Sequence, residues 1–544
     1  ADEDCHRLVH RARLTGLDPE ATYHGRGVGT TPDGEPYLGP DITFTAAGIT
    51  PPPTKPGVTR VPLTIRNSRE VNAVGWSVTS GVPIPQAELA DSAQVRVTLG
   101  GEEVLAQIKT LGNWRDGSVK WVLVTVIADV PAGGATEYVL EYGREVSREL
   151  TAPDLARADG DRVLVDTGAL TFAVDSHGDI VLANGSSCAT TLAAEGGVEF
   201  STALGEAELT IEEAGPNRAV IKTVGHLADA DGNLSFAVEQ RIEAYRGCAY
   251  LRVHHTFIND LGDKFTNIES LSFEAPVAAG NWSAPLVEGE PLVLSADGPA
   301  VRQLFDSEVF VGDARSDGRV VGALVSEDPS GCAVAVRSFW QNYPKGLRVG
   351  SEGVSVDLAP DFEPGLYDEF PFEKEGHHLY YYLLEGHYRF RSGMAKTHEL
   401  LLDFEAPERR AGQCELFQRP LQLTATPAWY CDSKVFYDVA PRDEVKFKAY
   451  EEAADRNFPG YLAGRERTHD YGLMNFGDWY PERGANWGNI EYDTQNAFFL
   501  EYIRSGREDA LFLGHDTELH HAFCLCTMVS RIHNHKPVGY CILH

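Results

Sequence analysis

A segment near the end of the sequence combines aromatic rings, carboxylates, amides and an arginine between glycines. Residues 474–489 read Met-Asn-Phe-Gly-Asp-Trp-Tyr-Pro-Glu-Arg-Gly-Ala-Asn-Trp-Gly-Asn and show neither helical nor strand periodicity. Flat apolar faces hold sugar rings, while amides and charges bond hydroxyl or carboxylate groups. This composition indicates a carbohydrate site, although an irregular loop whose tryptophans fill a core would share it. The candidate binding residues are Asp478, Trp479, Glu482, Asn486 and Trp487.

Histidines crowd the end of the chain, at positions 515, 520, 521, 533, 535 and 544. Because imidazole titrates near neutrality, any of them that faces a cleft could act as base or acid. We single out His533 and His535, which follow the last predicted helix, in a position typical of functional loops. Asp516 and His520 share one helix face and could hold a divalent metal with either of them, but local hydrogen bonds are the commoner use of such residues. We therefore expect no cofactor, with a divalent metal as the alternative.

A second cationic and aromatic set precedes this region. Residues 339–345 read Phe-Trp-Gln-Asn-Tyr-Pro-Lys, and residues 386–398 contain Arg389, Arg391, Lys396 and His398. In an otherwise acidic chain these cations could form the positive patch that an acidic sugar chain needs, with Trp340, Lys345 and Lys396 as contacts. A solvated strand face is the alternative. His254 and His255 point to opposite strand faces, and His255 reads as a buried, hydrogen-bonded histidine.

The elements that must position these residues are mainly β-strands. Residues 58–150 alternate as in a small β-barrel, with an Asp116-Gly117 hairpin turn between Trp114 and Trp121, which we expect in the barrel core. Residues 151–424 continue as strands and turns, too many for one small barrel, and predict a large β-sandwich. Helical spacing appears only later, at 444–458, 490–505 and 508–528, within a C-terminal unit at 425–544.

The N-terminal residues predict a further, incomplete β module. Residues 1–47 contain three short strand patterns, at 8–14, 22–27 and 43–46, and Leu-Asp-Pro-Glu-Ala-Thr-Tyr at 17–23 resembles the tyrosine corner of a fibronectin type III module. Only the last strands of such a module would be present. Residues 48–57 are rich in proline and predict an extended linker.

Composition excludes several classes of partner. The 544 residues carry a formal net charge of −33, which opposes binding to nucleic acid or to anionic membrane. No apolar run is long enough to span a bilayer. The nine cysteines form no metal-type CxxC pairs. We expect three or four domains and an extracellular or cell-surface location.

Four phrases, in their order and spacing, resemble the exo-acting rhamnogalacturonan lyases and their relatives. They are Gly-Val-Pro-Ile-Pro at 81–85, Trp-Arg-Asp-Gly-Ser-Val-Lys-Trp at 114–121, the 339–345 phrase and residues 475–493. The resemblance covers about residues 58–544 and implies a barrel, a central β-sandwich and an (α/α) toroid. The expected fold is thus multidomain and mainly β, with the start of a C-terminal α/α toroid.

The resemblance also implies β-elimination on an acidic polysaccharide. Such a lyase removes the C5 proton of a uronic acid and expels the oxygen at C4, so it needs a carboxylate neutraliser, a base and an acid. Arg483 could grip the carboxylate, while Tyr480 or a histidine such as His533 or His535 moves protons. A structural ion pair between Arg483 and Glu482 is the alternative.

Two other functions remain open at this point. A non-catalytic glycan-binding or cell-surface adhesion protein would use the β domains as spacers and contacts. A hydrolase would use Asp478 and Glu482 as its paired acids.

Overall fold

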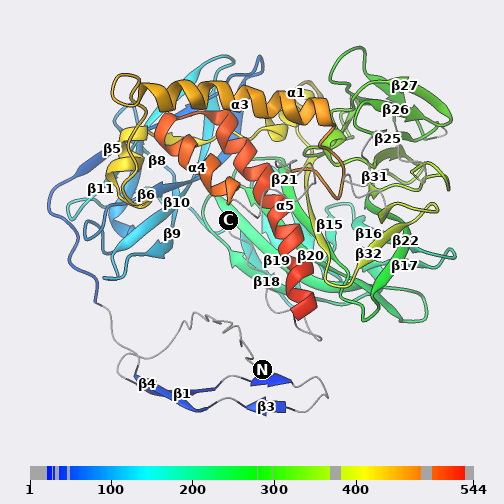
Figure 1. The fold of residues 1–544 in the computed structure, drawn as a ribbon, viewed down its shortest axis with the longest axis horizontal. Coiled ribbons are helices and arrows are strands. Elements are labelled where there is room, and N and C mark those ends of the chain that lie inside the picture. The colour runs from blue at the N-terminus through cyan, green and yellow to red at the C-terminus, as the bar shows by residue number, and fades with distance from the viewer. Residues whose placement is uncertain are drawn as a thin grey trace, which may run out of the picture.

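The computed structural model describes residues 21–26, 28–30, 36–38, 40–45, 50–277, 280–296, 298–367, 382–478 and 493–532. These ranges form a mainly β, multidomain molecule whose helices come late in the chain (Figure 1). The fold class that the sequence predicts is therefore confirmed. None of the helices in these ranges is long and apolar enough to cross a bilayer.

Four short strands at the N-terminus form two antiparallel pairs. β1 (Thr22–Gly25) pairs with β4 (Ile42–Thr45), and β2 (Val28–Thr30) pairs with β3 (Pro36–Leu38). The rings of Tyr23 and Phe44 stack across the first pair at 5.9 Å. The strand patterns at 22–27 and 43–46 are thus observed as strands, while 8–14 lies outside the described residues. The fibronectin type III assignment stays a prediction.

The barrel region contains two sheets. One has the order β34-β5-β11-β7-β8 and the other β6-β10-β9. Alternation along β5 sends Val61, Leu63 and Ile65 into the core, where all three are completely buried. The strands are β5 (Thr59–Arg66), β6 (Ala73–Pro83), β7 (Val95–Leu99), β8 (Glu102–Val104), β9 (Gln107–Asn113), β10 (Val119–Val130), β11 (Ala135–Tyr142) and β34 (Leu423–Ala425). Since β34 pairs with β5, the chain returns to the barrel after completing the sandwich.

The predicted hairpin connects β9 and β10, and its Trp114 backbone N–H donates to the Ser118 carbonyl at 2.8 Å. The expectation that Trp114 and Trp121 fill the barrel core is wrong, because both are only half-buried. Trp114 donates its indole N–H to the Ile84 carbonyl, and Trp121 meets the ring of Phe436 edge-on. The buried tryptophan of the barrel core is Trp76.

The central region is a sandwich of antiparallel strands. One layer runs β18-β19-β20-β21-β33-β29-β28-β23-β24, and the other is built around β16-β22-β31-β30-β25-β26-β27. Inner-face residues of both layers, such as Val253, Leu400 and Val356, belong to one hydrophobic core. Because side chains alternate along each strand, the first layer also has an outer face, which turns towards the barrel and the helices.

The first-layer strands are β18 (Ala207–Glu213), β19 (Arg218–Ala228), β20 (Leu234–Tyr245), β21 (Tyr250–Ile258), β23 (Trp282–Ala284), β24 (Leu292–Leu294), β28 (Ala323–Ser326), β29 (Ala333–Val336) and β33 (Ala395–Asp403). The remaining strands are β12 (Ala156–Asp159), β13 (Arg162–Asp166), β14 (Thr171–Val174), β15 (Ile180–Leu182), β16 (Ser187–Ala194), β17 (Glu199–Ser201), β22 (Phe265–Ala275), β25 (Val301–Phe305), β26 (Glu308–Val311), β27 (Ala314–Asp317), β30 (Lys345–Val349), β31 (Val354–Ala359) and β32 (Tyr388–Arg391).

Within the described ranges, five α-helices follow or cover the sandwich. They are α1 (Pro407–Gln418), α2 (Pro427–Asp432), α3 (Lys448–Thr468), α4 (Thr494–Ser505) and α5 (Glu508–Ile532). α4 ends where the sequence indicates, with Gly506 left-handed and its N–H bonded to the Tyr502 carbonyl. α3 begins four residues after the predicted start and runs on through Pro459, and α1 lies where only strands were expected. The α/α toroid stays a prediction.

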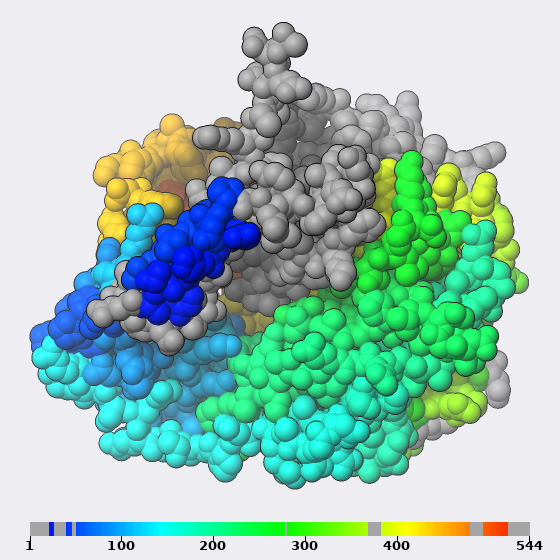
Figure 2. Space-filling view, turned by 90° about the horizontal axis from the view of Figure 1, so that it is seen from below, coloured from blue at the N-terminus to red at the C-terminus, as the bar shows by residue number. Residues whose placement is uncertain are grey.

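The helices connect the two β regions. α3 extends along one edge of the molecule from the barrel towards the sandwich, and α5 crosses the sheet that contains β19, β20 and β21 (Figure 1). The barrel and the sandwich lie side by side when the molecule is turned (Figure 2). The outer face of the first sandwich layer is therefore partly covered by helix.

Candidate functional site

The two chemically rich phrases of the sequence meet in the structure. The Gly472 N–H donates to the Gln341 carbonyl at 2.7 Å, and the Leu473 N–H donates to the Tyr343 carbonyl at 2.7 Å. The segment 469–478, which follows α3, is thus fixed to the sandwich beside residues 339–345. Nothing in the spacing of the sequence predicts this contact, because more than a hundred residues separate the phrases.

Side chains reinforce this attachment. The guanidinium carbon of Arg319 lies 3.9 Å from the centroid of the Trp340 ring, and the Tyr471 ring lies 4.8 Å from the same ring. Arg319 also donates to Glu466 at 2.9 Å, and the Tyr471 hydroxyl donates to the same carboxylate. Trp340, predicted to stack on a sugar, is therefore packed between protein groups here, and its binding role stays a prediction that this packing does not favour.

Lys345 and Lys396 point into the sandwich. The Lys345 ammonium is completely buried and donates to the carbonyls of Asn342, Pro344 and Leu358, which uses all three of its donors. Lys396 is also buried, next to the buried His398 on β33. The alternative of a solvated strand face is therefore wrong for Lys396 and His398, and a saccharide contact by Lys345 stays a prediction that its placement does not favour.

His255 is buried and shares a hydrogen bond with the Thr190 hydroxyl at 2.8 Å, as the sequence predicts. Its neighbour His254 points to the outer face, 3.6 Å from Glu243. The same alternation places Glu399 on the outer face, opposite His254 in the β21–β33 register. The alternation of side chains therefore predicts polar residues on both faces of this strand pair. Glu399 was nevertheless not identified as a candidate from the sequence.

The outer face carries a dense row of charges. Glu243 accepts from Arg218 and from the Tyr245 hydroxyl, while Arg337 contacts Glu399 at 2.5 Å. Burial opposes ionisation of Glu399, and the charges of Arg337 and the nearby histidines overcome it, so that its pKa is about 2. The carboxylate of Glu399 is therefore ionised at neutral pH.

α5 faces this row. Nε2 of His515 lies 3.8 Å from Glu399, and Asp516 on the same helix accepts from Arg465 of α3 at 3.1 Å. Burial raises the pKa of Asp516 and lowers that of His515. The helix, the sandwich face and the end of α3 thus meet in one cluster of titratable groups.

Asp478 enters this cluster from the 469–478 segment. It is buried, and the preceding Gly477 lies directly against the backbone of α5 at Asp516 and the side chain of His520. Asp470, on the same segment, has a pKa raised to about 7, chiefly by burial, and the charge of Asp478 adds to the effect. The structure thus brings Asp478, Trp340 and the outer-face charges into one region of the fold.

The other sequence-derived candidates lie outside the described residues. They are Trp479, Tyr480, Glu482, Arg483, Asn486, Trp487, His533 and His535. The described residues on either side of 479–492 are Asp478 and Asp493, and Asp493 immediately precedes α4. The roles of these eight residues stay predictions.

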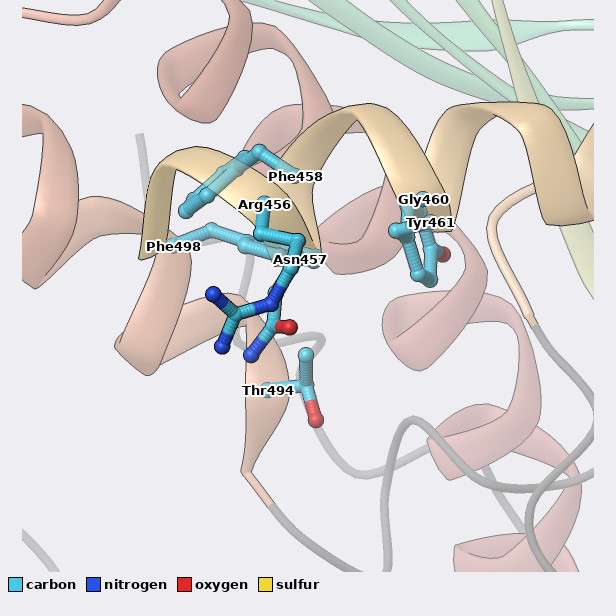
Figure 3. Close-up of a pocket in the computed structure, with 7 residues that line it drawn as sticks. All are labelled: Arg456, Asn457, Phe458, Gly460, Tyr461, Thr494 and Phe498. Atoms are coloured by element: carbon cyan, nitrogen blue, oxygen red, sulfur yellow. The ribbon is translucent and has the colours of Figure 1, made fainter. Parts of the chain in front are cut away.

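A cavity of about 440 Å³ lies between α3 and α4. Figure 3 shows its lining residues, with the side chains of Arg456 and Asn457 extending towards Thr494. The rings of Phe458, Phe498 and Tyr461 also line the cavity. This lining suits apolar contact and brings together no acid and base, so the outer-face cluster is the better candidate for chemistry.

A metal centre is not assembled by the described residues. Among them, no three His, Cys, Asp or Glu side chains are placed to share an ion. Asp516, one half of the metal pair suggested by the sequence, is bound to Arg465, and His520 is buried.

Both β regions match known domain families. Residues 65–142 match the PcRGLX-like N-terminal RIFT barrel domain, and residues 155–282 match the PcRGLX-like protein central beta sandwich domain. The chain therefore contains PcRGLX-like barrel and central sandwich domains. These two matches include neither a fibronectin type III module nor a toroid. No curated protein matches the sequence significantly.

Two solved structures share a distant likeness. An alpha-mannosidase from Enterococcus faecalis V583 is 13% identical with a TM-score of 0.43, over 68% of this chain and 46% of that one. A protein in the glycosyl hydrolase family 38 from Enterococcus faecalis is 12% identical with a TM-score of 0.42, over 68% and 47%. This chain spans less than half the length of either, and a likeness at this level carries no argument about function.

Proposed function

We propose that this protein is a polysaccharide lyase that cleaves a uronate-containing glycan, such as rhamnogalacturonan, by β-elimination. The PcRGLX-like domains support a carbohydrate substrate, and the phrases at 475–493 and 339–345 support the lyase class. Arg483 neutralises the uronate carboxylate and Tyr480 supplies a proton to the leaving oxygen in this proposal. The acidic polysaccharide would be met outside the cell or at its surface.

One observation carries the proposal. The 469–478 segment is bound to the sandwich at Gln341 and Tyr343 and rests on α5 at Asp516, beside the charged outer face. The described part of this segment therefore ends at Asp478, against the helix that carries His515. Titratable groups with shifted pKa values concentrate at the same place, as expected of a site for proton transfer.

An absorbance assay tests the proposal. The protein is incubated with rhamnogalacturonan, and formation of the unsaturated uronate is followed over time. Growth of this signal supports the lyase. Binding without the signal supports the glycan-binding alternative, and new reducing ends without it support a hydrolase.

Two arginine variants test the proposed role of Arg483 directly. Arg483→Ala should lower turnover by about 100-fold or more, because a missing electrostatic contact to the developing charge costs that much. Arg157→Ala is the control, since Arg157 is exposed on β12, and turnover should remain at the wild-type level. Equal turnover in both variants would contradict the role of Arg483.

A further inference from the structure

His515 contacts one oxygen of a carboxylate whose other oxygen is held by an arginine. Oε1 of Glu399 lies 3.8 Å from Nε2 of His515, and Oε2 lies 2.5 Å from Nη1 of Arg337. The three groups come from α5, β33 and the residue after β29. Activated bases in enzymes are commonly oriented by a third group in this way, and distances in unliganded proteins are often longer than in the reacting complex.

At 3.8 Å the Glu399 carboxylate is too far for a hydrogen bond to His515, but its charge favours the tautomer that is protonated at Nε2. A neutral imidazole that turns Nε2 towards a carboxylate carries its proton on Nε2, which leaves Nδ1 as the acceptor. Within the part of the chain that the structure describes, Nδ1 of His515 has no hydrogen-bond partner. The side chain is 43% exposed, whereas that of Glu399 is 11% exposed. A ligand on the outer face can therefore reach the ring.

The surrounding charges are compatible with a neutral ring. Burial lowers the pKa of His515, and the charge of Glu399 only partly offsets this effect. Arg337 and His254 act in the same direction as burial, while Asp516 opposes it. Asp516 is paired with Arg465, so its influence is itself reduced. The imidazole is thus uncharged near neutral pH and able to accept a proton.

We propose that Nδ1 of His515 accepts the C5 proton of the uronate, with Glu399 and Arg337 as positioning residues. The electron pair of the C5–H bond forms the C4=C5 double bond, and the C4–O bond breaks with its pair on the leaving oxygen. The leaving oxygen receives the proton that the proposed function assigns to Tyr480, which solvent later replaces, and His515 returns its proton to solvent. This inference rests on the proposed lyase function and names the base that the sequence left open.

His254 also lies on this face, and it is less suited to this role. Its side chain is 20% exposed, and its Nε2 lies 3.6 Å from Glu243. Glu243 also accepts from Arg218 and Tyr245, so His254 faces a carboxylate that already has two donors. We assign it a supporting position beside Glu399.

Kinetics of His515→Gln test the proposal, because glutamine keeps a polar side chain but cannot act as a base. Turnover on rhamnogalacturonan should fall by about 100-fold or more with little change in KM. Added imidazole should restore part of the turnover of His515→Ala, an effect that a structural role would not produce. His226→Gln is the matched control, because His226 on β19 is also paired with a carboxylate, Asp260. Its turnover should match the wild type.

These kinetic results distinguish a failure of the lyase proposal from a failure of the proposed role of His515. If the wild type forms no unsaturated uronate, the lyase function and the role of His515 fall together. If the wild type is active and His515→Gln retains turnover within about twofold, only the role of His515 falls.

Nitrogen NMR of the wild-type protein provides a second measurement that needs no variant to fold. Nδ1 of His515 should be unprotonated near neutral pH and should shift when rhamnogalacturonan oligosaccharides are added. A protonated Nδ1, or a resonance that does not respond to the oligosaccharides, would overturn the proposal.

Discussion

Gly477 lies so close to α5 that a Cβ atom at this position would come within 2.3 Å of the Asp516 carbonyl oxygen. The same atom would lie 2.7 Å from Cβ of His520, and the backbone of Gly477 has a φ of +104°. A residue with a side chain is therefore excluded twice, by the space and by the backbone conformation. Glycine at 477 allows the segment that carries Asp478 to rest on the helix that carries His515.

Gly477→Ala should separate these two elements. We expect the free energy of unfolding of the C-terminal region to fall by about 1–3 kcal/mol, the usual cost of a strained backbone position. Thermal unfolding followed by far-UV circular dichroism measures this change. Turnover should fall as well, because the site is built across the contact.

Gly464→Ala is the control for this substitution. Gly464 lies inside α3, and the nearest atom to an added Cβ is the end of the Arg467 side chain at 3.9 Å. Alanine should stabilise the helix by about 0.5–1 kcal/mol. A Gly477→Ala protein that melts at or above the wild-type temperature would show that this contact is not needed.

The strands and turns could be predicted from the sequence because the patterns that indicate them are local. Alternation, turn residues and the C-terminal glycine of α4 each depend on neighbours within a few positions. The pairing of β34 with β5 was not readable, since it joins residues more than three hundred positions apart. α1 was missed for a different reason. It begins with Pro407 and has a completely buried Arg410, so it lacks a clear amphipathic pattern.

The candidate site was predicted in part for the same reasons. The composition of 474–489 and of 339–345 identified the two phrases, but their contact depends on the fold. The burial of Lys345 could not be predicted, because the sequence does not show that backbone carbonyls can satisfy an ammonium inside a sandwich. Glu399 was overlooked because one carboxylate on a strand is commonplace until α5 places His515 beside it.

A buried histidine makes the sandwich core sensitive to acid. His398 on β33 is stacked on Phe257, and neither of its ring nitrogens has a hydrogen-bond partner among the described residues. Burial, together with the charges of Lys345 and Lys396, holds its pKa well below the ordinary value. The unfolded chain therefore binds an additional proton below about pH 6.5, and the free energy of unfolding falls as the pH decreases through that range.

His398→Phe should remove this sensitivity. Relative to the wild type, the variant should gain about 1.4 kcal/mol of stability for each pH unit below about 6.5, as long as the folded wild-type ring stays neutral. Urea unfolding at several pH values measures the difference. A difference that is constant with pH would mean that the buried ring does not titrate as described.

His226→Gln is a control whose stability relative to the wild type should change with pH in the opposite direction to that of His398→Phe. The hydrogen bond to Asp260 raises the pKa of His226, so its stabilising contribution is present below the ordinary pKa and is lost as the pH rises through the folded value. The variant should therefore be less stable than the wild type in acid, with the difference shrinking as the pH rises.

Asp470, at the candidate site, should make the free energy of unfolding fall as the pH rises, which is the reverse of the effect of His398. Burial raises its pKa to about 7, and the Thr468 hydroxyl donates to its carboxyl group at 2.9 Å. Because the folded pKa is raised, the stability linked to this group is complete below about pH 3.9 and is lost as the pH rises through 7. An asparagine side chain cannot ionise and still has a carbonyl oxygen to accept from Thr468, so Asp470→Asn should gain stability over the wild type as the pH rises from about 5 to about 8. Asp229→Asn is the control, since hydrogen bonds at its exposed turn lower the pKa of Asp229, so that its carboxylate is ionised in both the folded and the unfolded chain across this range and its stability difference from the wild type should not change with pH. If the stability difference between Asp470→Asn and the wild type is equally constant, Asp470 is already ionised in the folded protein and cannot exchange a proton near neutrality.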